Sequence, residues 1–431
     1  MKFQTVNGFK DILPDEAVRW RRLEEQARAV FRRFGLREIR VPIIESTELF
    51  ARAIGEATDV VEKEMYTFAD KGLTLRPEAT AGLLRAYIEH GLHVQQPVQR
   101  LFTIGPMFRH ERPQKGRQRQ FHQIDVEIIG ASEPGIDAEL MAMAQMLLNE
   151  LGLKVSLEIN SIGCPQCRPG FRTKLVEYLN KRLDGLCEDC RRRIHTNPLR
   201  ALDCKNKGCK ETVQAAPSIL DSLCSDCDTH FAFVRQQLDA LGVQYALNRF
   251  MVRGLDYYTR TTFEFITNEL GAQSAVAAGG RYDGLIEQLG GPAKMPGIGF
   301  GMGMERIVLL MEQQADKEES ADRADCFVAA LGGQALTFAA PFVHQLRCLG
   351  FVAAIDYSCR SLKAQMKQAD RVKARFVLMI GEEEIARQEA ALRNMGTQEQ
   401  SAFSLHGTAG ELAARLAELI TEKGKHEQAY C

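Results

Sequence analysis

Two apolar segments that flank a strongly basic one give the first secondary-structure prediction. Residues 98–108 are rich in β-branched and aromatic side chains, and residues 121–129 alternate between apolar and polar positions, as strands do. The stretch 109–123 holds five Arg and Lys residues around one glycine. The pattern predicts a hairpin whose loop carries guanidinium groups able to grip phosphate oxygens. A solvated basic surface loop is the alternative.

Breaks in the pattern predict two domains. Residues 311–323 are strongly charged, which is typical of a linker, and the short apolar runs CFVAAL, FVAAIDY and RFVLMIG beyond it alternate with helical segments. This βαβ pattern predicts a parallel sheet. The strands before the linker predict a mainly antiparallel sheet flanked by helices. We therefore predict an α+β domain over residues 1–324, interrupted by a helical, cysteine-rich insertion at about 165–240, and an α/β domain over residues 325–431.

Length and composition agree with this organisation. The chain has 431 residues, of which 45% are hydrophobic, and such a length predicts two to three domains. No segment approaches the roughly 20 apolar residues of a membrane span. The first residues lack an apolar signal core and enter a helix at Pro14. The sequence therefore predicts a cytoplasmic protein without a membrane partner.

The net charge of −1 hides a local concentration of positive charge. Arg360, Lys363, Lys367 and Arg371 recur at helical spacing and would form one basic stripe. Because phosphate neutralisation drives much of nucleic-acid binding, this stripe predicts contact with RNA. The alternative is a solvated helix face.

The glycine-rich segment 297–306 (GIGFGMGMER) changes the interpretation of the basic hairpin. Its glycines allow the backbone to approach a ligand closely. The hairpin begins with Phe-Arg-x-Glu at 108–111, and the glycine segment ends with Gly-x-Gly-x-Glu-Arg at 301–306. In this order the two resemble motifs 2 and 3 of the class II aminoacyl-tRNA synthetases. Residues 34–49 resemble motif 1, which builds the dimer interface in that class, so the resemblance implies a homodimer.

Three further segments resemble one family within that class. Residues 253–261 (RGLDYYTRT), 279–285 (GGRYDGL) and 75–80 (LRPEAT) are similar to segments of the histidyl-tRNA synthetases. The resemblance runs from Gly8 to the C-terminal helix. It implies a class II catalytic domain and a C-terminal anticodon-binding domain. The implied reaction activates L-histidine with ATP and Mg²⁺ to histidyl-adenylate and pyrophosphate, and then transfers histidine to the 3′ end of tRNA(His).

The resemblance also implies the residues that handle ATP. A carboxylate that attacks the α-phosphate creates negative charge that preorganised cations stabilise. In the family pattern, Arg109 holds the α-phosphate, Glu111 the adenine amino group and Arg117 the outer phosphates, while Arg306 covers the nucleotide. Arg253 is expected to be the second catalytic arginine, on the side of the α-phosphate opposite Arg109.

Recognition of histidine requires partners for an ammonium, a carboxylate and two ring nitrogens. The resemblance implies Glu78, Thr80 and Gln123 at the ammonium, with Glu127 and Tyr258 at opposite ring nitrogens. A site that pairs both nitrogens would reject other side chains, because they would leave buried polar groups unpaired. The expected histidine-binding set is Glu78, Thr80, Arg109, Gln123, Glu127, Arg253, Tyr257 and Tyr258.

Cysteine pairs recur in the insertion. CxxC spacing in a reducing compartment favours tetrahedral zinc over disulfides. The tightest linear quartet is Cys204, Cys209, Cys224 and Cys227, whereas the pair Cys187 and Cys190 could join either neighbouring pair; Cys164 and Cys167 form another. We predict a structural zinc ion held by that quartet. The alternative is that these cysteines are small core residues without a metal.

Two other functions fit parts of the sequence. One is a non-catalytic regulatory paralogue that controls histidine biosynthesis, but such paralogues usually lack the C-terminal domain and have damaged motifs. The other is a synthetase for threonine, proline or glycine, against which residues 253–258 argue. The chain departs from the family pattern at Cys359 and Lys373, where glycines are expected, and this raises a question about loop geometry.

Overall fold

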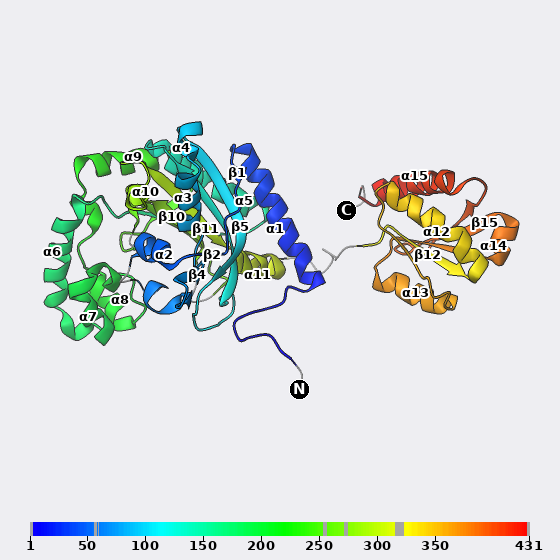
Figure 1. Ribbon diagram of the computed structural model, residues 1–431, viewed down its shortest axis with the longest axis horizontal. Coiled ribbons are helices and arrows are strands. Elements are labelled where there is room, and N and C mark those ends of the chain that lie inside the picture. The colour runs from blue at the N-terminus through cyan, green and yellow to red at the C-terminus, as the bar shows by residue number, and fades with distance from the viewer. Residues whose placement is uncertain are drawn as a thin grey trace. The chain divides into compact units, whose positions relative to one another are not determined.

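The computed structural model describes residues 3–55, 58, 60–252, 257–270, 275–314 and 323–428. The chain divides into two compact units, Met1–Ala315 and Asp316–Cys431 (Figure 1). The division falls within the stretch predicted to be a linker, although helix α11 (Met304–Gln314) continues into the first residues of that stretch. None of the helices in the described ranges is long and apolar enough to cross a membrane.

The first unit is built on an eight-stranded sheet among its described residues. Its order is β1-β5-β6-β11-β10-β9-β7-β8, and all pairs from β5 to β7 are antiparallel, which confirms the predicted sheet type. The predicted hairpin is also confirmed, because Phe108 pairs with Gln120 at the end where the loop joins the two strands. The strands are β1 (Arg37–Glu38), β5 (Gln99–Phe108), β6 (Gln120–Ile129), β7 (Ser156–Ser161), β8 (Tyr245–Leu247), β9 (Thr259–Ile266), β10 (Ala275–Arg281) and β11 (Gly297–Gly303).

Helices α1 (Pro14–Arg33), α5 (Pro134–Glu150) and α11 pack with this sheet around its main hydrophobic core. Pro14 stands at the first turn of α1 with Asp15 and Glu16, as predicted. A second core joins α2 (Thr47–Ile54), α3 (Thr80–Glu89) and α10 (Leu285–Gln288) to the sheet. The small sheet β2-β4-β3, formed by Ile44–Ser46, Leu73–Leu75 and Tyr66–Phe68, precedes α3.

The segment between β7 and β8 is helical. Helices α6 (Cys167–Asn180), α7 (Glu188–Thr196) and α8 (Lys207–Val213) form a separate hydrophobic core that includes Phe171 and Leu175. They lie at one edge of the unit in Figure 1. Helix α9 (Ser225–Ala240) returns the chain to α5 and the main core. The insertion is therefore a small subdomain whose last helix belongs to the sheet domain.

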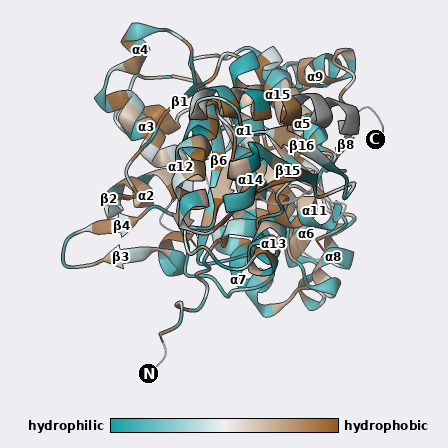
Figure 2. Cartoon of the chain, turned by 90° about the vertical axis from the view of Figure 1, so that its right-hand side faces the viewer, coloured by the Kyte–Doolittle hydropathy of each residue, from teal (hydrophilic) through white to brown (hydrophobic). Residues whose placement is uncertain are grey.

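The second unit has a five-stranded sheet of order β13-β12-β14-β15-β16. Three strands are parallel as predicted, but β15 and β16 are antiparallel, so the sheet is mixed. Helix α12 contains both apolar and polar residues, which are coloured brown and teal in Figure 2. The elements are β12 (Cys326–Leu331), α12 (Gly333–Cys348), β13 (Ala353–Ile355), α13 (Leu362–Arg371), β14 (Phe376–Gly381), α14 (Glu382–Arg387), β15 (Glu389–Asn394), β16 (Gln400–Ser404) and α15 (Ala409–Gln428).

The two departures from glycine lie in this unit, and both adopt the backbone conformation that glycine favours. Cys359 has φ 46° and Lys373 has φ 49°. Lys373 follows α13, where its N–H donates to the carbonyl of Asp370 and the N–H of Ala374 donates to that of Ala369. This is the Schellman arrangement that ends many helices. The loop geometry is therefore the one that glycine would adopt.

Candidate active site

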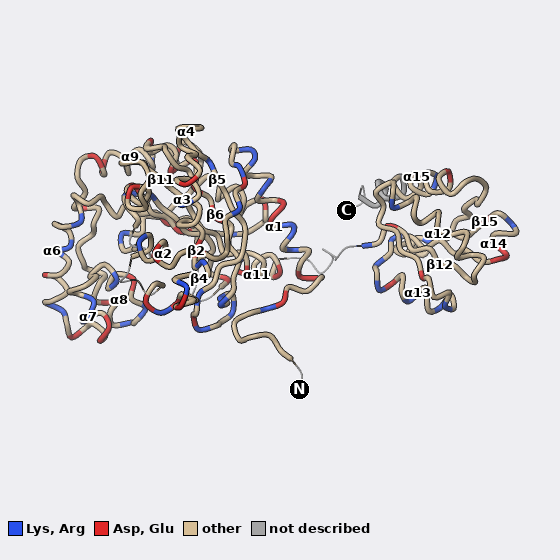
Figure 3. Tube along the Cα trace, in the orientation of Figure 1, with Lys and Arg blue, Asp and Glu red and all other residues tan. Residues whose placement is uncertain are grey.

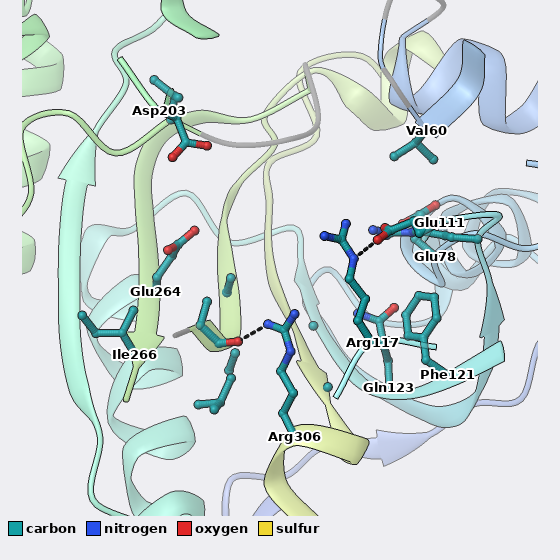
Figure 4. Close-up of a pocket in the computed structure, with 18 of the residues that line it drawn as sticks. Val60, Glu78, Glu111, Arg117, Phe121, Gln123, Asp203, Glu264, Ile266 and Arg306 are labelled. Carbon is teal, nitrogen blue, oxygen red and sulfur yellow. Dashed lines mark hydrogen bonds and ion pairs between the residues drawn. The ribbon is translucent and has the colours of Figure 1, made fainter. Parts of the chain in front are cut away.

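A cavity of about 880 Å³ lies in the first unit, between β6, β9, β10, β11 and the insertion. Its volume is within the range of small-molecule sites, roughly 300–1,000 Å³. Figure 4 shows side chains from these separate segments directed into one space. Nine predicted site residues line it, namely Glu78, Thr80, Arg109, Glu111, Arg117, Gln123, Tyr257, Tyr258 and Arg306.

Two predicted residues are not among the lining residues. Arg253 lies outside the described residues. Glu127 is only 1% exposed and lies behind the cavity surface, where both of its carboxylate oxygens accept hydrogen bonds. To contact a ring nitrogen of histidine, as predicted, Glu127 would have to give up its hydrogen bond with Thr80 or with Tyr282.

The hairpin supplies two of the arginines. Arg109 follows β5, and its Nε donates to the carbonyl of Pro77 at 2.8 Å while its guanidinium lies 5.4 Å from the ring centre of Phe121. Arg117 forms an ion pair with Glu111 within the same loop (Figure 4). These contacts fix the guanidinium groups before any ligand arrives, as electrostatic preorganisation requires.

Arg306 enters the same cavity from the first turn of α11. Its Nε donates to the carbonyl of Gly116 at 3.4 Å, and its Nη1 donates to the carbonyl of Ala275. Burial lowers the pKa of Arg117, and the positive charges of Arg109 and Arg306 act in the same direction. Three guanidinium groups thus repel one another across the cavity, and a polyanion would relieve that repulsion.

A second part of the site is built from carboxylates around the start of α3. Glu78 accepts hydrogen bonds from the backbone N–H groups of Thr80 (2.8 Å) and Ala81 (2.9 Å), so it also caps the helix. The Thr80 hydroxyl donates to Glu127 at 2.6 Å, and the Tyr282 hydroxyl donates to the other Glu127 oxygen at 2.6 Å. The start of α3, β6 and the end of β10 are thereby locked together.

Burial disfavours the charged forms of these carboxyl groups. It raises the pKa of Glu127 to about 8, despite the hydrogen bonds from Thr80 and Tyr282 that act in the opposite direction. Burial, and then the neighbouring Glu127 and Glu78, raise the pKa of Asp125 well above its usual value. A cation placed among these groups would favour their charged forms.

Asp125 is a site residue that the sequence analysis missed. It lines the cavity on the same face of β6 as Gln123, because alternate residues of a strand share a face. Among the described residues, Gln123 Oε1 and Asp125 Oδ2 are buried oxygens without a hydrogen-bond partner. The alternation Gln123, Asp125, Glu127 was the available signal, since three polar side chains then face one side of a buried strand.

Glycines in β11 leave room for these side chains. A Cβ atom on Gly301 would lie 2.8 Å from Oδ1 of Asp125 and 2.9 Å from Nε2 of Gln123. Glu305, two residues beyond β11, accepts hydrogen bonds from the backbone N–H of His122, at 2.9 and 3.0 Å, and pairs with its ring at 3.0 Å. The glycine segment is therefore fastened to the hairpin at a fixed separation.

The insertion also reaches the cavity, which the sequence analysis did not predict. Its lining residues there include Arg200, Asp203, Lys205 and Lys210. Figure 4 shows Asp203 across the cavity from Glu78 and Arg117. No local sequence pattern relates these residues to the strands that line the cavity, so the sequence alone did not indicate that they meet.

The predicted zinc quartet is not the one that the structure assembles. Cys164, Cys167, Cys224 and Cys227 form one cluster, and Cys187, Cys190, Cys204 and Cys209 form another; each could hold a metal ion. The prediction that joined Cys204 and Cys209 to Cys224 and Cys227 is therefore wrong. Proximity in the sequence is a poor guide here, because the N–H of Cys187, just before α7, donates to Sγ of Cys209 in α8, whereas Cys224, just before α9, lies beside Cys164, just after β7.

The predicted basic stripe lies on the second unit. Lys363, Lys367 and Arg371 are exposed and follow one another at four-residue spacing along α13, so they share a face. Blue segments mark this helix in Figure 3. Arg360 precedes the helix and pairs with Asp356 at 2.7 Å.

An antiparallel sheet whose hairpin and glycine-rich strand direct arginines into one pocket defines the chain as a class II aminoacyl-tRNA synthetase. The family model for histidyl-tRNA synthetase matches residues 8–307, and the anticodon binding domain model matches residues 325–415. The chain therefore belongs to the histidyl-tRNA synthetase family.

Similar proteins support this assignment. The histidine–tRNA ligase of Desulfotalea psychrophila is 58% identical over 97% of this chain and 96% of its own length. That of Geobacter sulfurreducens is 54% identical over 95% of this chain and 99% of its own length. The structure of apo histidyl-tRNA synthetase from S. aureus is 36% identical, with a TM-score of 0.79, and the match covers 96% of this chain and 100% of that one.

Proposed function

We propose that this chain is a histidine–tRNA ligase. It activates L-histidine with ATP to histidyl-adenylate and pyrophosphate, and it transfers histidine to the 3′ end of tRNA(His). The observation that carries the proposal is the division of one cavity into a cluster of guanidinium groups and a cluster of buried carboxyl groups. The first suits a triphosphate and the second suits an ammonium.

In the nucleotide half, Arg109 holds the α-phosphate, Arg117 the outer phosphates, Glu111 the adenine amino group, and Arg306 covers the nucleotide. Arg253 is the second catalytic arginine. The fixed positions of Arg109 and Arg306 support these roles, because cations that are already oriented stabilise the developing charge without reorganisation. Mg²⁺ accompanies ATP.

In the histidine half, Glu78, Thr80 and Gln123 receive the ammonium. The unpartnered Gln123 Oε1 supports this, since a buried acceptor calls for a donor. Glu127 and Tyr258 bind opposite ring nitrogens. The hydrogen bonds from Thr80 and Tyr282 that fix the Glu127 carboxyl group support its role, because an oriented carboxylate accepts a hydrogen bond from a ring N–H.

Several broader assignments belong to the same proposal. The chain acts in the cytoplasm as a homodimer, with residues 34–49 in the interface. Its tRNA partner contacts the insertion and the α13 stripe. The insertion holds structural zinc.

A regulatory paralogue of histidine biosynthesis is the alternative function. A solved structure from Bacillus halodurans C, described as an ATP phosphoribosyltransferase regulatory subunit/histidyl-tRNA synthetase, is 19% identical with a TM-score of 0.63, which shows a shared fold only. Curated relatives that are 54–58% identical are named histidine–tRNA ligase. The ligase is therefore favoured.

Histidine-dependent exchange of pyrophosphate with ATP tests the proposal. Histidine, and no other amino acid, is expected to support exchange. Arg253→Ala should lower the exchange rate and leave histidine binding nearly intact, while Lys154→Ala, at an exposed position between α5 and β7, should change neither. Absence of exchange with histidine, or an unchanged rate in Arg253→Ala, contradicts the assignment.

A further inference from the structure

The two cysteine clusters of the insertion have the geometry of tetrathiolate metal sites. In each cluster the four Sγ atoms lie within 4.8 Å of one another. Individual separations are 3.7 Å for Cys164 and Cys167, and 3.8 Å both for Cys164 with Cys224 and for Cys187 with Cys204. A Zn–S distance of about 2.3 Å in a tetrahedron places sulfurs about 3.8 Å apart. All eight cysteines are free, and these separations far exceed the roughly 2 Å of a disulfide.

The backbone around each cluster suits negatively charged sulfur. Cys187 precedes α7 and Cys224 precedes α9, so each stands at a helix N-terminus, where the helix dipole favours thiolate. The N–H of Cys187 donates to Sγ of Cys209 at 3.1 Å, and the N–H of Cys224 donates to Sγ of Cys167 at 3.1 Å. Such amide contacts orient and stabilise metal-bound thiolates.

The two clusters fasten different parts of the insertion. The first, formed by Cys164, Cys167, Cys224 and Cys227, joins the chain leaving β7 to the start of α9, and we call it the base cluster. The second, formed by Cys187, Cys190, Cys204 and Cys209, joins α7 to the segment that leads into α8, and we call it the wall cluster.

The wall cluster lies directly behind the active-site cavity. Cys204 itself lines the cavity, between Asp203 and Lys205. Arg200 and Lys210 line it on either side of this segment, and Lys205 and Lys210 are exposed. In Figure 3, blue segments recur along α7 and α8. The arginines assigned to ATP are Arg253 and those of the hairpin and α11, so the exposed Lys205 and Lys210 are cavity cations to which the nucleotide assignments give no role.

We propose that each cluster holds one zinc ion, and that the ion of the wall cluster positions Arg200, Lys205 and Lys210 for the phosphates at the 3′ end of the tRNA. The functional half of this inference rests on the proposed ligase activity, whereas the metal content does not. Four thiolates are a soft donor set that selects zinc in a reducing compartment. The segment 200–210 has few helical hydrogen bonds of its own before α8, so the ion would supply its rigidity.

Metal analysis of the purified full-length protein tests the first half. About two equivalents of zinc per chain are expected after dialysis. Cys187→Ser/Cys190→Ser should retain about one equivalent, Cys164→Ser/Cys167→Ser about one, and Cys348→Ser, at an exposed cysteine outside both clusters, about two. Cobalt substituted for zinc should give the absorption of tetrahedral Co²⁺–thiolate. Iron in place of zinc, less than one equivalent of any metal, or two equivalents in both cluster variants would overturn the proposal.

A comparison of two partial reactions tests the second half. Cys187→Ser/Cys190→Ser should raise the KM for tRNA in aminoacylation at least tenfold relative to any change in histidine-dependent pyrophosphate exchange. Lys205→Ala/Lys210→Ala should do the same while it keeps two zinc equivalents, which separates loss of the cations from misfolding. Lys181→Ala, an exposed lysine of the insertion away from the cavity, is the matched control. Equal losses in both reactions would refute a role on the tRNA side, and absence of exchange in the unsubstituted protein would instead refute the ligase function.

Discussion

Gly299 of β11 and Glu127 of β6 are register partners, and a Cβ atom on Gly299 would lie 1.8 Å from Oε2 of Glu127. The same oxygen accepts the Tyr282 hydroxyl at 2.6 Å. The carboxylate therefore occupies the space that any larger residue at position 299 would need. Glu127 can therefore take this position only because residue 299 has no side chain.

Gly299→Ala is expected to displace Glu127 and to impair histidine binding. Overpacking of this kind costs about 1–3 kcal/mol, so the KM for histidine in pyrophosphate exchange should rise roughly tenfold or more, with a lower thermal midpoint. Gly170→Ala is the control, because a Cβ atom there meets nothing within 4 Å and alanine favours helix α6. An unchanged KM in Gly299→Ala would show that Glu127 can move without consequence.

These contacts also show how far the sequence could predict the site. The strands of the hairpin, the start of α1 and nine cavity-lining residues follow from local patterns and from the family resemblance. Tyr282 lies in the family-like segment 279–285, but its hydrogen bond to Glu127 depends on how β10 and β6 are aligned through β11. Such pairing is set by the whole sheet, and no single stretch of sequence encodes it.

The cysteine clusters illustrate the same limit. Spacing within each pair predicted metal ligands, but the choice between pairs depends on helix packing. Hydrophobic residues such as Phe171 and Leu202 decide which helices of the insertion meet, because they share one core. Likewise, the antiparallel strands β15 and β16 have short segments with exposed residues, and the apolar-run pattern that revealed β12 and β14 does not mark them.

Histidine binding is expected to release protons from the site. Glu127 has a pKa of about 8 in the free protein, so it is largely protonated at neutral pH. The ammonium received at Glu78, together with a ring N–H that donates to Glu127, favours the charged forms of Glu127 and Asp125 and lowers both pKa values. Calorimetric titration at pH 7.5, where free imidazole is mostly neutral, should give binding heats that differ between buffers of unequal ionisation enthalpy in the sense of proton release.

Glu127→Gln should reduce that proton release. It should also flatten the pH dependence of stability. The folded-state pKa of Glu127 lies above its usual value of 4.5, so its contribution to stability is full below about pH 4.5 and is lost as the pH rises through about 8. Thermal midpoints measured from pH 5 to 8 should therefore fall less steeply in the variant. Proton uptake on histidine binding, or an identical slope in the variant, would contradict the assignment.

The α13 stripe is expected to bind tRNA through phosphate contacts. The triple variant Lys363→Ala/Lys367→Ala/Arg371→Ala should raise the KM for tRNA and weaken its dependence on salt, because each lost phosphate contact reduces the slope of log K against log salt by about 0.7–0.9. Exchange of pyrophosphate should not change. Arg387→Ala removes an exposed cation of α14 from the same unit and is the control. A solvated helix face would leave the KM for tRNA and its salt dependence as they were.

The end of α13 offers a stability test that is independent of function. Lys373 has φ 49°, which costs a residue with a Cβ atom about 1–2 kcal/mol, and its hydrogen bonds to the end of α13 come from the backbone alone. Lys373→Gly should therefore keep the Schellman arrangement and raise the free energy of unfolding of the second unit by about 1 kcal/mol, after the greater freedom of glycine in the unfolded chain is deducted. Lys367→Gly, at an exposed position inside α13, should lower it by about 1 kcal/mol. Urea unfolding of the full-length protein compares the two, and destabilisation by Lys373→Gly would mean that the lysine side chain itself stabilises the end of α13.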